Sequence, residues 1–194
     1  MTEPASLFGI AAGGLSFFAF LVYIRSTLRG DTRPNRATWW VLTLVGVMIA
    51  SSYYSEGARN TMWVPISYVV GPLIVAILSV RYGEGEWEPL DKWCLGVAII
   101  SAVIWYLSQK PAVVLAMNIA MDFVGLLPTV KKSWLRPEGE DRTAWGLETL
   151  AGMLNIVALE RWTLGLAFYP AYLLVVNGAI TALLFRPVFR RRMM

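Results

Sequence analysis

Seven long stretches of apolar residues, separated by short polar segments, run along the 194-residue chain. The hydrocarbon core of a membrane is about 30 Å thick, so a helix needs roughly 20 apolar residues to cross it. Because the polar segments are short, nearly the whole chain would lie in the bilayer. The pattern predicts an all-α membrane protein with seven transmembrane helices. We place them at residues 6–28, 37–54, 62–80, 91–108, 111–133, 143–160 and 163–186.

The chain also repeats part of its own sequence. At an offset of 106 positions Arg36 falls on Arg142, Trp39 on Trp145, Thr43 on Thr149, Leu44 on Leu150 and Gly46 on Gly152, and at an offset of 105 Pro65 falls on Pro170 and Arg81 on Arg186. Internal repeats in a hydrophobic chain are typical of transporters, whose related halves move about a site between them. We therefore divide the chain into a first triple-helix repeat at residues 1–90, a linker helix at 91–110 and a second triple-helix repeat at 111–194.

Basic residues gather in three segments that a seven-span chain places on one side of the membrane. These segments, residues 25–36, 131–142 and 186–192, hold most of the Lys and Arg of the chain. By the positive-inside rule, this side is cytoplasmic, which puts the N-terminus outside and the C-terminus inside. We expect an integral protein of the plasma (inner) membrane.

Composition narrows the class of function. Hydrophobic residues make up 57% of the chain, charged residues 15%, and the mean hydropathy is +0.55, as in polytopic membrane proteins. One Cys and no His argue against a disulfide, a metal site and an enzyme, and we expect no cofactor. The net charge of +4 lies mostly at helix ends facing lipid phosphate. We expect a small-molecule solute and the lipid bilayer as partners, no nucleic acid, and either a monomer or a homo-oligomer.

One segment of the second repeat resembles the PQ-loop motif of the SWEET and PQ-loop transporter superfamily. It consists of residues 127–133 (LPTVKKS), followed by Trp145 and by the small and polar residues 152–155. The order of three helices, a linker helix and three more helices also resembles this superfamily. The resemblance implies two triple-helix bundles, related by an axis along the membrane normal, that work by alternating access.

The resemblance also implies hinge and substrate residues. The family uses prolines as hinges, which Pro128 matches, and an Asn in the third helix of each repeat to bind sugar, which Asn177 matches. The counterpart of Asn177 in the first repeat is Pro72. From its depth alone, Pro72 would kink its helix. The matched pair Pro65 and Pro170 lies near the outer helix ends, either as outer hinges or as ordinary helix-start prolines.

Polar side chains inside the predicted helices are costly in lipid and therefore mark candidate sites. Asp122 lies near the middle of the fifth helix, where it is either a proton-coupling or cation-binding group or a structural carboxylate; its counterpart in the first repeat is Ser16. Asn118 is one turn before Asp122 on the same face, and Asn155 and Asn177 lie at mid-depth. The four residues predict a substrate cavity suited to a polyol, a sugar or a zwitterion, although each Asn also fits an interhelical hydrogen bond.

Two further groups of side chains have more than one interpretation. Glu148 lies about two turns inside the cytoplasmic end of the sixth helix, as a gate residue or as a salt-bridge partner of Lys131 or Arg142. The Trp and Tyr residues fall mostly near helix ends, which is typical of an interfacial aromatic belt. Trp63 or Tyr68 would alternatively serve as a stacking platform for a sugar ring.

The sequence therefore predicts a membrane transporter that moves a small polar solute, sugar or amino-acid-like, by alternating access. Asn177 favours a sugar uniporter, whereas Asp122 favours a proton-coupled amino acid or a cation-like substrate. The alternative is a ligand receptor of the same fold that does not transport. A rhodopsin is excluded, because a retinal Schiff base needs a buried lysine in the last helix and all Lys residues lie near helix ends.

Overall fold

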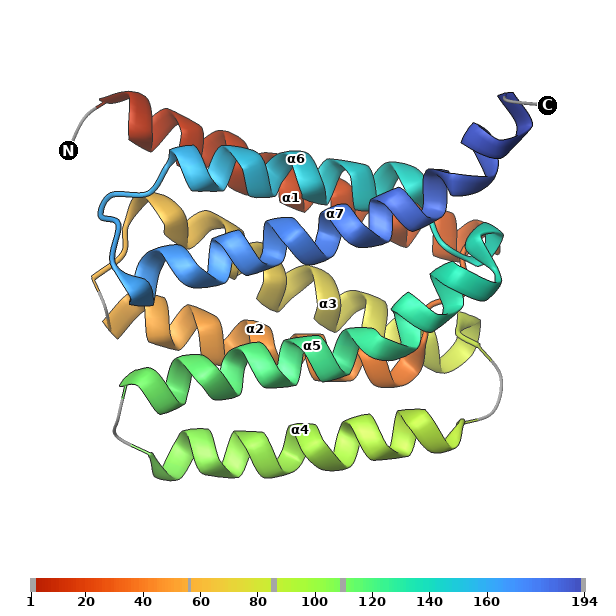
Figure 1. Ribbon diagram of the computed structural model, residues 1–194, viewed down its shortest axis with the longest axis horizontal. Helices are drawn as coiled ribbons and strands as arrows, with labels where there is room; N and C mark the ends of the chain where they lie inside the picture. The colour runs from red at the N-terminus through yellow and green to blue at the C-terminus, as the bar shows by residue number, and fades with distance from the viewer. Residues whose placement is uncertain (1–2, 56, 85–86, 109–110, 193–194) are drawn as a thin grey trace.

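The computed structural model describes residues 3–55, 57–84, 87–108 and 111–192, which form seven α-helices and no strand (Figure 1). The helices are α1 (Glu3–Arg29), α2 (Arg36–Ser55), α3 (Trp63–Tyr82), α4 (Pro89–Leu107), α5 (Pro111–Leu135), α6 (Arg142–Val157) and α7 (Leu164–Arg192). Two short 3₁₀ helices, η1 (Asn60–Met62) and η2 (Pro137–Gly139), precede α3 and α6. The predicted all-α class is confirmed, and each predicted helix overlaps one observed helix.

Among the residues that the structure describes, five helical segments are long and apolar enough to cross a membrane. These segments are Ala5–Arg29, Arg36–Ser55, Asn60–Tyr82, Pro89–Leu107 and Leu166–Arg186. The described parts of α5 and α6 contain no such segment. With 16 residues, α6 is about 24 Å long and ends at Val157, three residues before the predicted end. The chain is therefore compatible with membrane insertion.

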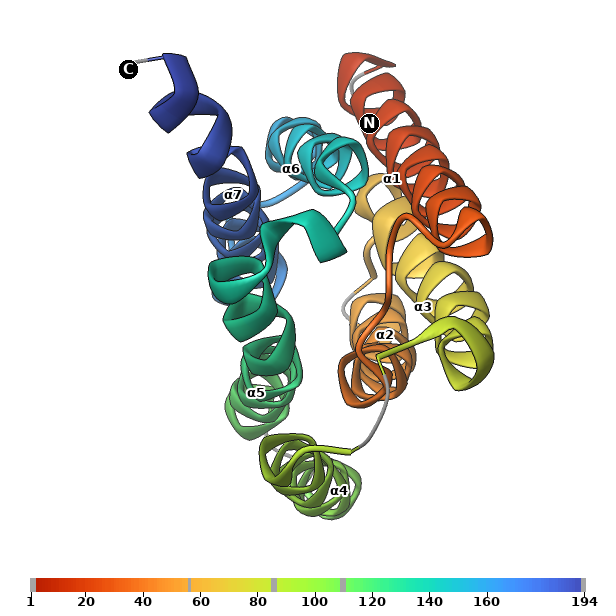
Figure 2. The ribbon, with the colours of Figure 1, turned by 90° about the vertical axis from the view of Figure 1, so that its right-hand side faces the viewer.

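The helices pack as two sets of three with the same arrangement (Figure 2). In the first set α3 lies between α1 and α2, and in the second set α7 lies between α5 and α6. Between the sets, α1 packs on α6 and α5 packs on α2, while α4 lies outside against α5 and α2. If α1, α2 and α3 are exchanged with α5, α6 and α7, the helix contacts within one set become those within the other. The contact of α1 with α6 likewise becomes that of α5 with α2. The residue boundaries of the two repeats stay a prediction.

The starts of α2 and α6 use the same capping device at matched sequence positions. The side chain of Asn35 accepts a hydrogen bond from the backbone N–H of Thr38 at 3.0 Å, and Asp141 accepts one from Ala144 at 2.9 Å. At the offset of 106 positions, Asn35 falls on Asp141 and Thr38 on Ala144. Side-chain oxygens at the position before a helix satisfy N–H groups that have no helical partner. The repeat thus fixes where both helices begin.

Glycine allows the closest helix contact in the first set. A side-chain carbon added at Gly46 of α2 would overlap the carbonyl of Tyr68 in α3, so only Gly permits this approach. At the matched Gly152 of α6, an added carbon would lie 3.5 Å from Leu174, an ordinary contact. The two sets share an arrangement but not the same tightness of packing.

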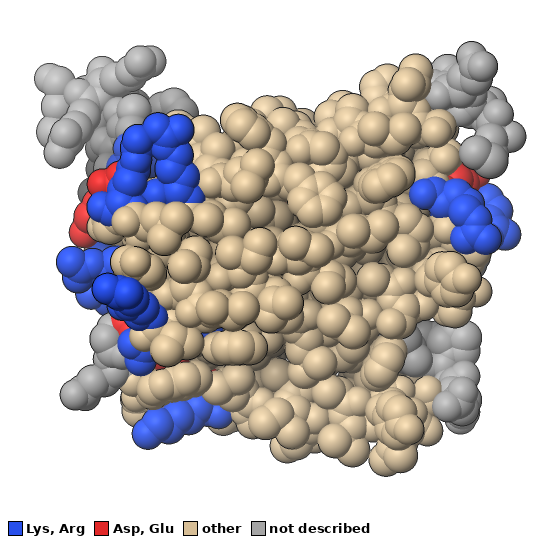
Figure 3. Space-filling view, turned by 180° about the vertical axis from the view of Figure 1, so that it is seen from behind, with Lys and Arg blue, Asp and Glu red and all other residues tan. Residues whose placement is uncertain are grey.

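On the face shown in Figure 3, the exposed charged side chains lie at the two ends of the bundle. A broad band without charged side chains covers the middle of this face, and most of its Lys and Arg gather at one end. This end carries the α1–α2, α3–α4 and α5–α6 connections (Figure 1). We call it the basic end and the opposite one the far end. An apolar belt between two polar ends is the surface that a lipid bilayer requires.

Candidate functional site

A small cavity lies between the two sets of helices and is lined by residues of both. It has about 20 Å³ of space for a water-sized sphere, which is room for one water molecule. Its walls contain the aromatic side chains Phe20, Tyr23, Trp39, Tyr68 and Trp145. Its polar lining residues are Asp122, Glu148 and Asn177. The cavity therefore combines aromatic walls with two carboxylates and an amide.

Repeat-related positions line this cavity from opposite sides. At the offset of 106 positions, three lining pairs correspond: Phe20 with Leu126, Trp39 with Trp145, and Leu42 with Glu148. The cavity therefore lies where the two sets of helices meet and where their sequence repeat converges. Within the last pair an apolar side chain has been exchanged for a carboxylic acid, so the chemistry of the two halves differs.

Glu148 is the centre of a buried hydrogen-bond network. It is 7% exposed and accepts hydrogen bonds from the hydroxyl of Ser16 at 2.9 and 3.1 Å and from the hydroxyl of Tyr68 at 3.3 Å. The side-chain amide of Asn177 donates to the Tyr68 oxygen at 3.0 Å. These residues come from α1, α3, α6 and α7. The network joins the two sets of helices, and the partners around Glu148 are hydroxyl and amide groups.

The serines beside Glu148 have fewer hydrogens than contacts. Ser16 Oγ lies 2.6 Å from Ser67 Oγ, and Ser67 donates to the carbonyl oxygen of Val64 at 2.7 Å. Together with the contact to Glu148, this makes three hydrogen bonds for two hydroxyl hydrogens. A proton on the Glu148 carboxyl group would supply the third. The geometry fits Glu148 as a group that takes up and releases a proton.

Asp122 occupies the other side of the cavity with few partners. It is fully buried, and its Oδ1 accepts a hydrogen bond from the hydroxyl of Tyr169 at 3.3 Å. Its Oδ2 and the hydroxyl of Tyr172 are neighbours that interact, but they lie outside good hydrogen-bonding geometry and neither has another hydrogen-bond partner among the described residues. A buried acceptor without a donor is costly unless a ligand or water satisfies it. Asp122 thus has an oxygen in the interior that lacks a well-formed hydrogen bond.

The structure places the four predicted substrate residues in the interior but brings only two of them to the cavity. Asp122 and Asn177 line it, whereas Asn118 and Asn155 are buried away from it. The amide of Asn118 donates to Ser52 at 3.4 Å, as an interhelical hydrogen bond. Glu148, which the sequence suggested as a gate or salt-bridge residue, lines the cavity instead. Whether any of them binds substrate stays a prediction.

The sequence reasoning missed the group around Glu148. Ser16 was noted only as the counterpart of Asp122, and Tyr68 only as a possible stacking platform. A signal was present in the repeat. The counterpart of Ser16 is Asp122 and the counterpart of Glu148 is Leu42, and both counterparts line the cavity. What could not be read from the sequence was that α1 packs on α6 and brings the two residues together.

A buried ion pair closes the bundle at the basic end. The ammonium of Lys132 lies 2.5 Å from the Glu140 carboxylate, and these side chains are 3% and 0% exposed. Glu140 also accepts hydrogen bonds from Tyr23 of α1 and from the indole of Trp145, each at 2.9 Å. Lys132 donates to the carbonyl oxygen of Arg33 at 2.5 Å. The pair therefore ties the second set of helices to the first.

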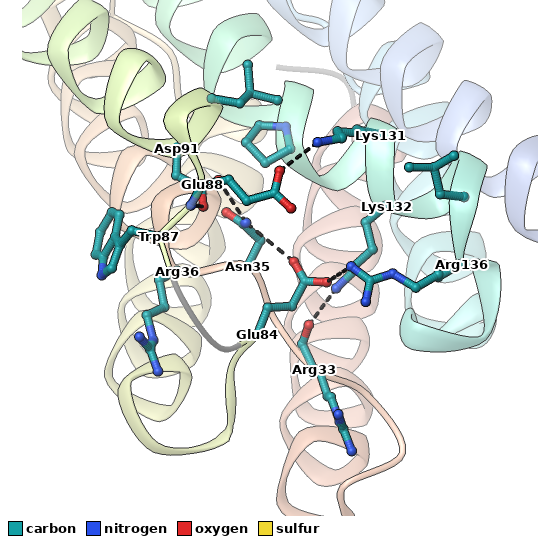
Figure 4. A pocket seen from close by; sticks show the side chains of 13 residues that line it. Arg33, Asn35, Arg36, Glu84, Trp87, Glu88, Asp91, Lys131, Lys132 and Arg136 are labelled. Atoms are coloured by element: carbon teal, nitrogen blue, oxygen red, sulfur yellow. Dashed lines mark hydrogen bonds and ion pairs between the residues drawn. The ribbon is translucent and has the colours of Figure 1, made fainter.

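A larger, solvent-accessible pocket of about 680 Å³ lies beside this pair (Figure 4). Two ion pairs cross it from the α3–α4 connection to the end of α5: Glu88 with Lys131 at 2.6 Å, and Glu84 with Arg136 at 3.2 Å. The hydrogen bond and the charge of Lys131 lower the pKa of Glu88. Glu88 and Lys131 are about half exposed, so their pairing contributes little stability.

A second carboxylate closes the far end. Glu160, in the α6–α7 connection, accepts hydrogen bonds from the backbone N–H groups of Arg59 and Asn60 and from the hydroxyl of Thr61. Burial acts to raise the pKa of Glu160, but the N–H groups of Arg59 and Asn60 outweigh it, so that the pKa lies below its usual value. Tyr53 adds a hydrogen bond to the Leu166 carbonyl oxygen at 3.0 Å. The two sets of helices are thus joined at both ends of the bundle.

The predicted hinge prolines all lie within helices. Pro72 and Pro128 are inside α3 and α5, Pro65 is in the first turn of α3, and Pro170 is in the second turn of α7. Pro128 also lines the pocket at the basic end. Their role as hinges stays a prediction. In the part of the chain that the structure describes, no group of three or more Cys, Asp or Glu side chains is arranged to hold a metal ion.

Comparisons of the chain with protein-family models, with curated proteins and with solved structures found no match.

Proposed function

We propose that the chain is an integral membrane transporter that carries a small polar solute through the central cavity by alternating access. The observation that supports this most is the place of the cavity. It contains two carboxylates and an amide, it is lined by repeat-related residues, and it lies between two sets of helices with the same arrangement. Transporters built from repeats commonly bind their solute at such an interface.

Alternating access requires the two sets of helices to separate at one end at a time. The contacts that would break are α1 with α6 and α2 with α5. At the basic end they are reinforced by Lys132 and Glu140, and at the far end by Glu160. The contacts of Lys132 with Glu140 are confined to the basic end, and those of Glu160 to the far end. The helices can therefore separate at one end while the contacts at the other end stay formed. Pro72 and Pro128, inside α3 and α5, are the proposed hinges.

In this proposal all seven helices cross the membrane, including α5 and α6. These two helices carry the cavity carboxylates Asp122 and Glu148, whose side chains are buried in the protein interior. The basic end faces the cytoplasm by the positive-inside rule, which puts the N-terminus outside. This arrangement agrees with the SWEET and PQ-loop resemblance, and we propose membership of that superfamily.

Uptake into proteoliposomes tests the proposed function. Vesicles that contain the purified protein should accumulate at least one member of a panel of sugars, amino acids and amines faster than protein-free vesicles, with or without an inward proton gradient. Vesicles with an unrelated membrane protein at the same density control for leakage. Specific binding of a panel member without any flux would contradict the transporter and favour the receptor of the same fold.

A further inference from the structure

We propose that the central cavity binds a small organic cation that carries an ammonium group. This names the solute class of the proposed transporter and rests on that proposed function. The chemistry that recognises the cation is the pair of carboxylates, Asp122 and Glu148, set among aromatic side chains.

The charge of the cavity is the first argument. Two carboxylates line it, and none of its lining residues, all of which the structure describes, is Lys or Arg. The ion pairs of Lys131, Lys132 and Arg136 lie instead at the basic end. The partners of Glu148 and Asp122 are neutral hydroxyls: Ser16 and Tyr68 for Glu148, and Tyr169 and Tyr172 for Asp122. Buried carboxylates without a counter-charge are complementary to a cation or a proton, and they disfavour an anionic solute.

The hydrogen-bonding capacity of the cavity is the second argument. Asp122 Oδ2 is buried outside hydrogen-bonding geometry, with the Tyr172 hydroxyl as its neighbouring donor, and Glu148 lines the same cavity. An ammonium group has three N–H donors and no acceptor, so it suits these two carboxyl groups once the helices move apart and expose their oxygens. Asn177 reinforces this polarity, because its amide hydrogen occupies the Tyr68 oxygen and leaves the Tyr68 hydrogen directed at Glu148.

The aromatic walls are the third argument. Phe20, Trp39, Tyr68 and Trp145 line the cavity on several sides. Cations are attracted to the faces of aromatic rings, and most strongly to Trp. The carboxylates therefore attract the charge of an organic cation, and the aromatic side chains contact both its charge and its carbon atoms. A neutral sugar would gain the ring contacts but would leave both carboxylates without a counter-charge.

The size of the cavity restricts how such a solute enters. About 20 Å³ is open to a water-sized sphere, less than an amine of several carbon atoms occupies. The two sets of helices must therefore move apart before the amine binds. This agrees with alternating access and favours a short, slender amine over a bulky one.

Binding to the purified, full-length protein in detergent tests the inference without requiring transport. Isothermal titration calorimetry would compare ethanolamine with ethylene glycol, and 1,4-diaminobutane with 1,4-butanediol, with glucose as a further neutral probe. We expect saturable binding of at least one amine and none of its matched diol or of glucose. Equal binding of an amine and its diol, or binding of glucose alone, would overturn the inference, as would the absence of binding by both amines.

Charge-neutral variants identify the site. Asp122→Asn and Glu148→Gln should each weaken binding of the amine by about tenfold or more, because each removes a charged acceptor while keeping the shape. Glu138→Gln is the matched control, since Glu138 is exposed in η2 outside the cavity. Unchanged affinity in a folded Asp122→Asn or Glu148→Gln protein would contradict the assignment. If a variant does not fold, the comparison of amine with diol in the parent protein still decides.

The outcomes separate this inference from the proposed function. Binding of an amine without flux in proteoliposomes supports the site but contradicts the transporter. Flux of a sugar without binding of either amine supports the transporter but contradicts the cation site.

Discussion

Replacing Lys132 by Met should lower the free energy of unfolding by about 3–5 kcal/mol, because it leaves the Glu140 carboxylate buried without its counter-charge. Glu140 is completely buried and would keep only the hydrogen bonds from Tyr23 and Trp145. The Arg33 carbonyl oxygen would also lose its donor. Thermal unfolding of the detergent-solubilised protein measures the change as a large drop in melting temperature.

The neighbouring Lys131 provides a matched control. It has the same side chain one position earlier, but its ion pair with Glu88 is about half exposed. Lys131→Met should therefore change the melting temperature little. Adding Glu140→Gln to Lys132→Met should recover part of the loss, because the unpaired charge disappears. Equal destabilisation by Lys131→Met and Lys132→Met would show that the buried pair has no special part in closing the basic end.

Replacing Asp122 by Asn should abolish uptake that depends on a proton gradient, whereas exchange of solute between the two sides should persist at solute concentrations high enough to offset the weaker binding. An amide keeps the size and the hydrogen bond from Tyr169 but cannot take up and release a proton. Exchange needs only the bound solute to cross, whereas gradient-driven uptake needs a proton to accompany it. Uptake in proteoliposomes at two external pH values measures both processes.

Two further variants complete this test. Asp31→Asn, in the exposed α1–α2 connection, should keep the gradient dependence of the parent protein. Glu148→Gln asks whether the second carboxylate is the coupling group instead, as its contact with Ser16, which in turn contacts Ser67, suggests. Gradient dependence that persists in Asp122→Asn and disappears in Glu148→Gln would move the coupling from α5 to α6. Persistence in both variants would sink proton coupling at this cavity.

The helices could be predicted from the sequence because apolar stretches of roughly 20 residues are typical of membrane-spanning helices and uncommon elsewhere. The prediction was less accurate where a helix ends without a change in hydropathy. Ala158 and Leu159 after Val157 are still apolar, but the helix ends at Val157 and the following connection brings Glu160 to the N–H groups of Arg59 and Asn60. That ending depends on contacts with a connection about one hundred residues earlier, which local pattern does not reveal.

The candidate site could be predicted in part, for a similar reason. Asp122 and Asn177 were identified because polar groups at mid-depth in a helix are costly wherever the helix packs. The partner of Glu148 depends on which helix lies opposite. The position of Glu148 along its helix suggested Lys131 or Arg142 as its salt-bridge partner at the membrane surface. In the structure α1 packs on α6, and the partner is Ser16 instead. The burial of Lys132, one residue after the exposed Lys131, likewise depends on tertiary contacts.

Cross-linking the basic end tests alternating access most directly. Arg33 donates its backbone N–H to the carbonyl oxygen of Gly139 at 3.2 Å, across the two sets of helices, so Arg33→Cys and Gly139→Cys should form a disulfide in a Cys94→Ala background. Reduced proteoliposomes should take up the solute, oxidised ones should not, and a reducing agent should restore uptake, while Gly139→Cys alone responds to neither treatment. Equal uptake before and after complete cross-linking, or no uptake in any form, would contradict transport by separation of the two sets of helices.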